Sequence, residues 1–242
     1  MPLTEHLREL RSRLIKSIVA YLIGAGISFY FVKDIFELLK EPLLKSYPKV
    51  QLITISPMEP FYIYIKISLV FGFIIAFPVI VYQVWRFVEP GLYPHEKKLV
   101  LPLSILSLLL FIMGSLFSYF FVLPLALRFL LGIGVEQLQI SPFLSVDLYI
   151  SFLLKMIVAF GIAFQLPIVN YLLLRAGIVS EGQLKSFRKY FIVIAFVIGA
   201  LVAPDVSTQV LMAIPLIALY EISLLFGRLA KKKEKALQKV QT

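Results

Sequence analysis

The chain has 242 residues, of which 60% are hydrophobic and only 16% are charged, whereas an ordinary globular domain has about 25% charged residues. This composition excludes a soluble domain, so the net charge of +10 indicates basic loops on one side of a membrane and not a nucleic-acid partner. The absence of cysteine excludes disulfides and thiolate chemistry, and two histidines argue against a metal centre, so we expect no metal and no cofactor.

The first predicted element is an amphipathic helix over residues 3–14, in which leucines recur at three- and four-residue spacing. We expect it to lie along the membrane surface and to lead into a first span over residues 14–32. Glu9 and Arg13 stand four positions apart on this helix, so the simplest interpretation of Glu9 is a local ion pair. The span carries small residues that let another helix approach closely, namely Ala20, Gly24 and Ser28.

Residues 33–60 form the longest connection, and they are too apolar for a disordered linker, which favours an ordered cap. Within the cap we predict an interfacial helix from Asp34 to Leu44. Pro42 is expected to end this helix, because proline lacks the N–H of a helical hydrogen bond. Residues 53–57 are expected to be extended.

The second span is predicted over residues 61–85 with a kink at Pro78, and the third runs from Leu99 to about Leu123. Prolines and a glycine between residues 87 and 98 separate the two spans. Aromatic residues near the ends of spans are expected to be anchors at the membrane–water interface, namely Tyr82, Trp85, Tyr93 and Tyr190.

The polar segment over residues 87–98 holds Glu96, which has two interpretations. Pro94 suits the first turn of the next helix, so Glu96 would stabilise the positive end of that helix. The alternative is that Glu96 is an exposed anionic receptor for a cationic ligand.

A second loop over residues 132–147 leads to a fourth span over residues 148–174, which holds Gln165 near its middle. Polar groups at that depth usually face protein or water. We therefore expect the Gln165 amide to form a hydrogen bond with a neighbouring span or with a partner helix.

The last two spans are predicted to be short. Residues 190–203 give about 21 Å of helix against a hydrocarbon core of about 30 Å. A tight turn at Pro204 and Asp205 follows, and the final span is apolar mainly over residues 210–220. The first of these spans again has a face of small residues, namely Ala195, Gly199 and Ala203.

The distribution of lysine and arginine along the chain determines the predicted membrane topology. Of the 24 lysines and arginines, 17 fall in the amino-terminal segment, two loops and the tail that share one side in a six-span arrangement. The positive-inside rule places that side, with both termini, in the cytoplasm. The predicted fold is therefore all-α, a single six-span membrane domain over residues 1–230 followed by a basic cytoplasmic tail over residues 231–242.

The sequence offers no support for an enzyme. It contains no glycine-rich phosphate loop, no nucleophile elbow, no zinc-protease helix and no buried pair of carboxylates, so we expect no catalytic residue. Six spans, an ordered cap and a charged cytoplasmic face fit a receptor or a scaffold better than a carrier.

Four stretches, taken together, resemble the TatC family, the multi-span subunit of the twin-arginine protein translocase. The first is residues 6–14, and the second is residues 78–88 with Pro90 and residues 92–98. The others are residues 159–161 with Phe164 and Pro167, and residues 204–206 followed by residues 209–215. The resemblance extends from about residue 6 to residue 228.

This resemblance implies a multi-pass protein of the prokaryotic cytoplasmic (inner) membrane that receives folded cargo bearing a signal peptide with two adjacent arginines. It also implies single-span partners, TatA and in many systems TatB, and transport driven by the proton-motive force; we also expect self-association. The family's two signal-binding carboxylates fall on Glu9 and Glu96, and Arg11 and Phe87 match the same recognition surface. Outside that surface, the resemblance assigns partner- or transport-related roles to Pro42, Gln165 (Glu in many relatives) and Asp205.

Two other functions are alternatives. A transporter of small molecules or ions would need ionisable groups deep in its spans, whereas only the amide of Gln165 lies clearly at mid-depth. Flux through liposomes without partner proteins would favour the transporter. Binding of a peptide that weakens on arginine-to-lysine exchange would favour the receptor, and a passive scaffold would show neither.

Overall fold

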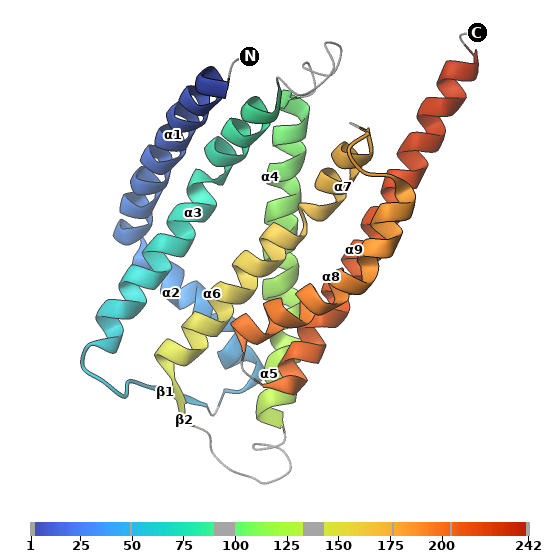
Figure 1. Ribbon diagram of the computed structural model, residues 1–242. Coiled ribbons are helices and arrows are strands. Elements are labelled where there is room, and N and C mark those ends of the chain that lie inside the picture. The colour runs from blue at the N-terminus through green and yellow to red at the C-terminus, as the bar shows by residue number, and fades with distance from the viewer. Residues whose placement is uncertain are drawn as a thin grey trace.

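The computed structural model describes residues 3–48, 50–89, 100–132, 143–175, 177–203 and 205–240. Long helices lie side by side, with α1 at one edge and α9 at the other (Figure 1). Both termini lie at one end of this bundle, here called the termini end. The short elements α2, β1, β2 and α5 lie at the opposite end, here called the capped end.

Helix α1 (Leu3–Tyr30) packs along α3 (Glu59–Val88). A Cβ atom on Gly24 would lie 2.5 Å from the carbonyl oxygen of Gly72, so the two backbones touch where only glycine fits. This confirms that the small residues of the first span admit another helix. The prediction of a separate surface helix over residues 3–14 is wrong, because α1 is one unbroken helix and no proline or glycine interrupts it before Gly24.

The predicted ordered cap is confirmed, but it is not purely helical. Helix α2 (Val32–Ser46) is followed by β1 (Gln51–Ile53), which pairs in parallel with β2 (Phe143–Ser145). The two three-residue strands correct the all-α expectation and tie the segment between α2 and α3 to the segment that precedes α6. The predicted loop over residues 132–147 therefore ends in a strand.

Pro42 lies inside α2 and does not end it, contrary to the prediction. A proline cannot donate to the carbonyl oxygen four residues earlier, which belongs to Leu38. The hydroxyl of Tyr119 donates to that oxygen at 2.7 Å, and the hydroxyl of Tyr149 donates to the carbonyl oxygen of Leu39 at 2.7 Å. The Tyr119 hydroxyl thus takes the place of the missing proline N–H at Leu38, Tyr149 adds a bond at Leu39, and the helix continues to Ser46.

The third and fourth predicted spans each contain an irregular turn. Helix α4 (Val100–Phe117) passes through a π-helical turn, η3 (Ser118–Val122), into α5 (Leu123–Gly132). The fourth span is two helices, α6 (Val146–Ala163) and α7 (Leu166–Arg175), separated by a turn at Phe164 and Gln165. Pro167 suits the first turn of α7, where its missing N–H is not needed.

Helices α8 (Glu181–Val202) and α9 (Val206–Val240) form an antiparallel hairpin. A Cβ atom on Gly199 would lie 2.9 Å from Cα of Gln209, and Ala195 is fully buried, which confirms the predicted face of small residues. Near the termini end, the Arg188 guanidinium forms an ion pair with Glu221 at 2.5 Å. The hairpin is therefore fixed at both of its ends.

Among the described residues, five helical segments are long and apolar enough to cross a membrane: Glu5–Tyr30, Glu59–Val88, Val100–Gly132, Val146–Arg175 and Val206–Leu225. Helix α8 does not meet this criterion, because polar and charged residues occupy its first turns and its apolar run begins only at Tyr190. A sixth crossing at α8 stays a prediction.

Candidate functional site

A groove of about 700 Å³ opens at the termini end between the first turns of α1 and the last turns of α3. Two carboxylates and four cationic side chains share its walls. Its lining residues are Glu5, Arg8, Glu9, Ser12, Arg13, Lys16, Tyr82, Gln83 and Arg86. This mixture of charges suits a charged ligand whose charges are arranged to match it, more than a ligand selected by net charge alone. It is called the charged groove below.

Glu9 lies in the charged groove with only 23% of its side chain exposed. Arg13 Nε donates to Glu9 Oε1 at 2.9 Å, and a second N–H of Arg13 donates to the same oxygen. The predicted ion pair within α1 is therefore confirmed. Arg13 also reaches across to α3, where its Nη1 donates to Oε1 of Gln83 at 3.3 Å.

Phe87 lies in the last turn of α3, and its ring stacks on the imidazole of His6 with 4.5 Å between ring centroids. This contact joins the start of α1 to the end of α3 beside the charged groove. No pattern in the sequence indicated the stacking, because the two residues are 81 positions apart. Arg86 pairs with Glu89 at 2.6 Å in the same turn, a contact that three-residue spacing of opposite charges could have indicated.

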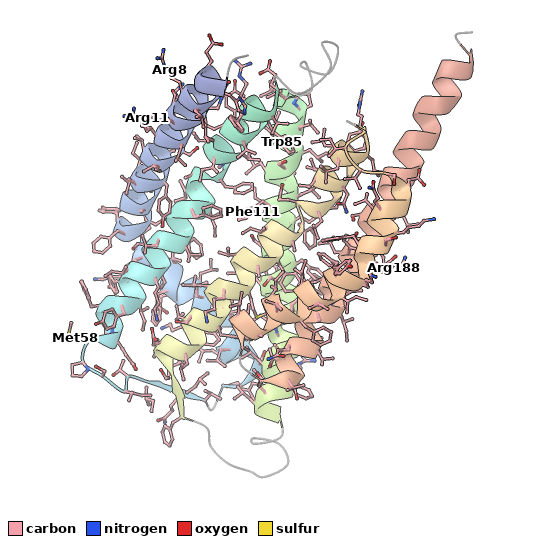
Figure 2. All side chains as sticks on the ribbon, in the orientation of Figure 1. Arg8, Arg11, Met58, Trp85, Phe111 and Arg188 are labelled. Atoms are coloured by element: carbon pink, nitrogen blue, oxygen red, sulfur yellow. The ribbon has the colours of Figure 1, made fainter. Side chains whose placement is uncertain are left out.

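The other two predicted recognition residues are Arg11 and Glu96. Arg11 is exposed and points away from α3 (Figure 2). Glu96 lies outside the described residues, which stop at Glu89 and resume at Val100.

Ser107 of α4 connects α3 to the break between α6 and α7. Trp85 Nε1 donates to Ser107 Oγ at 3.0 Å, and Gln165 Nε2 donates to the carbonyl oxygen of Ser107 at 3.0 Å. The predicted hydrogen bond of Gln165 to a neighbouring span is thus confirmed. Trp85 is only 8% exposed and lies between α3 and α4, so its prediction as an interfacial anchor is wrong (Figure 2). Its indole N–H tolerates burial because the hydroxyl oxygen of Ser107 accepts its hydrogen bond.

Pro42 and Asp205 lie far from the charged groove, at the capped end. Asp205 caps α9, because the backbone N–H of Thr208 donates to its Oδ1 at 2.7 Å. The predicted site residues therefore fall into three neighbourhoods: the charged groove, the Ser107 connection and the capped end. Within the described ranges, no group of three or more histidine or acidic side chains is close enough to hold a metal ion.

A family model described as "Sec-independent protein translocase protein (TatC)" matches residues 5–215. The chain belongs to the TatC family. It is 68% identical to the Sec-independent protein translocase protein TatC of Aquifex aeolicus (strain VF5), over 99% of this chain and 100% of that one. It is 42% identical to the protein of the same name from Escherichia coli (strain K12), over 94% of this chain and 88% of the relative.

Solved structures agree with this assignment. One described as "Crystal Structure of Twin Arginine Translocase Receptor- TatC" superposes with a TM-score of 0.88 at 67% identity, over 93% of this chain and 99% of that one. A second, of the same receptor in DDM, gives a TM-score of 0.87 at 68% identity, over 92% and 99%. The resemblance seen in the sequence is confirmed. Together with its long apolar helices, the family makes the chain a polytopic membrane protein of protein transport.

Proposed function

We propose that this chain is the signal-peptide receptor of a twin-arginine translocase, and that the charged groove takes the paired arginines of the signal peptide on a folded cargo protein. The observation that carries the proposal is the contact between Glu9 and Arg13, in which this groove already holds a guanidinium group against a carboxylate. A planar guanidinium donates two parallel hydrogen bonds to a carboxylate, which the ammonium group of lysine does not.

An arginine of the peptide competes with Arg13 for Glu9. Arg13 has a second hydrogen-bond partner, since it already donates to Gln83 across the charged groove. In our proposal the peptide displaces Arg13 towards Gln83 and binds Glu9 with one arginine, while Glu96 binds the other. Phe87 at the end of α3 and Arg11 on the outer side of α1 complete the recognition surface.

The proposed topology has six spans with the termini end in the cytoplasm of a prokaryotic inner membrane. The distribution of lysine and arginine supports this orientation, because 17 of 24 lie on the side that faces the cytoplasm in this arrangement. The sixth crossing is α8, whose apolar part is short and packs against α9 through Ala195 and Gly199.

In this proposal the chain works with TatA-like and TatB-like single-span subunits and with further copies of itself, and the proton-motive force drives transport. The Ser107 connection and the capped end supply the contacts for these later steps. Gln165, Asp205 and Pro42 lie there, away from the charged groove.

The test is binding of a fluorescent twin-arginine signal peptide to the purified protein in nanodiscs at moderate salt. Glu9→Gln and Glu96→Gln keep side-chain shape and remove charge, and each is expected to weaken binding roughly ten- to a hundredfold, because charge-assisted hydrogen bonds contribute about 1.5–3 kcal/mol. Glu37→Gln is the matched control, since Glu37 is 70% exposed and lies on α2 at the capped end. Equal affinity of the wild type and the Glu9→Gln/Glu96→Gln double variant would refute the proposal.

A further inference from the structure

A second groove lies between α4, α7 and α9, separate from the charged groove, and has a volume of about 610 Å³. Its walls are almost entirely apolar. They are formed by Leu103, Leu106, Leu110, Met113, Phe117, Phe164, Pro167, Ile168, Tyr171, Pro215, Ala218, Leu219 and Ile222. It is called the apolar groove below.

The apolar groove extends along α4 from Leu103 to Phe117, about 21 Å at 1.5 Å per residue. It therefore starts near the termini end, where α4 begins, and reaches past the level of the break between α6 and α7. Phe164 and Pro167, which flank Gln165 at this break, line its far half. That length exceeds half of the hydrocarbon core, which is about 15 Å thick, so the part of an acyl chain that lies in one leaflet fits along the groove.

Volume distinguishes an acyl chain from a helix as the occupant. A helix about 10 Å across and 21 Å long fills roughly 1,600 Å³, well over twice the space available. A single hydrocarbon chain is narrow enough to enter. Several lining side chains remain partly exposed, including Leu106 at 46% and Ile222 at 46%, so the groove opens sideways to the membrane interior.

The end of the apolar groove nearest the termini carries a cation. Arg175, the last residue of α7, donates from Nη1 to the hydroxyl oxygen of Tyr171 at 2.6 Å. Its guanidinium also lies 5.8 Å from the centre of the Tyr171 ring, and Tyr171 lines the groove. A positive charge thus lies at the end of α7, one helical turn beyond the apolar wall.

We propose that the apolar groove binds one anionic phospholipid, with an acyl chain along α4 and the phosphate against Arg175. Basic pockets between spans on the cytoplasmic side are a recurrent way to hold anionic headgroups. This inference stands whether or not the charged groove binds signal peptides. It assigns a lipid site to the face formed by α4, α7 and α9.

The test uses native mass spectrometry of the full chain after exchange into mixed micelles that contain phosphatidylglycerol or phosphatidylcholine. Ala218→Phe places a ring in the apolar groove and is expected to reduce retained phosphatidylglycerol at least tenfold. Its matched control is Ala200→Phe on the exposed side of α8, which should leave retention unchanged. Ala218→Leu fills less space and replaces Ala218→Phe if the larger ring prevents folding.

The headgroup contact is tested separately. Arg175→Gln is expected to weaken retention of phosphatidylglycerol about fivefold, the effect of one basic residue near an anionic surface, and to leave phosphatidylcholine unaffected. Lys185→Gln removes an exposed charge from the first turns of α8 and serves as the control. Equal retention of the two lipids by the wild type, or retention of phosphatidylglycerol that neither Ala218 variant reduces, would overturn the proposal.

Discussion

Ser107 joins three parts of the bundle through two different atoms of one residue. Its hydroxyl accepts from Trp85 of α3, while its carbonyl accepts from Gln165 at the break between α6 and α7. The sequence indicated that Gln165 needs a partner but could not identify it, because the acceptor is a backbone carbonyl oxygen, a group that every residue carries. It also misplaced Trp85, since a tryptophan near the end of a span is typical of the interface.

Replacing Ser107 by alanine tests this contact. The Trp85 N–H would remain buried without its acceptor, which costs about 1–3 kcal/mol of unfolding free energy. We expect Ser107→Ala to lower thermal stability and to change the emission of Trp85, the only tryptophan in the chain. Ser104→Ala is the control, because Ser104 is also buried but its hydroxyl donates within α4 to Val100. Equal losses of stability in the two variants would contradict a special role for Ser107.

The other prediction at the scale of residues concerns Arg13, the internal competitor for Glu9. Partly exposed ion pairs contribute about 0.2–1 kcal/mol, so Arg13→Gln should raise the affinity for a twin-arginine peptide about one-and-a-half- to fivefold. High salt should diminish the gain, because it screens the charges. Lys45→Gln is the control, since Lys45 is 74% exposed and lies on α2 at the capped end. Weaker binding by Arg13→Gln would mean that Arg13 positions Glu9 instead of competing for it.

At the scale of elements, α2 shows what a local rule predicts and where it fails. A proline in a helix usually ends or kinks it, and the sequence analysis applied that rule at Pro42. The helix continues past Pro42, where Tyr119 donates to the carbonyl oxygen of Leu38 in place of the proline N–H and Tyr149 donates to the carbonyl oxygen of Leu39. Both tyrosines are distant in sequence, at least 80 positions away, so no pattern within residues 32–46 could have indicated them.

Removing these hydroxyls should loosen α2 from the bundle. We expect Tyr149→Phe to cost about 1–3 kcal/mol, because Tyr149 is 2% exposed and water cannot replace its bond to Leu39. Tyr119→Phe should cost less, since the bond that it makes to Leu38 is exposed to solvent. Thermal unfolding in detergent measures both, with Tyr62→Phe at a 52% exposed position as the control. The reverse order of the two losses would show that burial does not govern this contact.

The break between α6 and α7 is another feature that the sequence analysis did not predict. The run over residues 148–174 is mostly apolar and long enough for one span, although Lys155, Gln165 and Asn170 lie within it, so a single helix was predicted. Packing explains the difference. A Cβ atom on Gly114 would lie 2.6 Å from the carbonyl oxygen of Phe160 and 2.7 Å from the Phe164 ring, so α4 presses on α6 immediately before the break.

At the scale of the whole molecule, the sequence predicted the helical membrane fold, the ordered cap and the helix contacts through glycine. These features follow from the composition and from the spacing of residues close together in the chain, both of which can be read in every segment. The pairing of β1 with β2 and the grouping of site residues into three neighbourhoods follow from tertiary contacts between distant segments. The spacing of residues along the chain could not indicate these tertiary contacts.

In the hairpin of α8 and α9, the length of the helices is coupled to the contacts between them. Gly199 touches Gln209 at the capped end, and Arg188 pairs with Glu221 nearer the termini end. Four leucines inserted after Tyr190 would shift Arg188 along the helix by about 6 Å relative to Gly199 and separate it from Glu221. A second variant with a matching insertion in α9 before Glu221 restores the pair, so the two variants separate lost pairing from added length.

We expect the single insertion to reduce stability and transport together. The paired insertion should retain stability and peptide binding but still reduce transport, because in the proposed six-span arrangement the short apolar run of α8 would thin the membrane around the hairpin and a longer run would remove that mismatch. Peptide binding, thermal unfolding and export of a twin-arginine reporter in vesicles measure the three effects. Normal export by the paired variant would show that the short span serves only to keep α8 in register with α9.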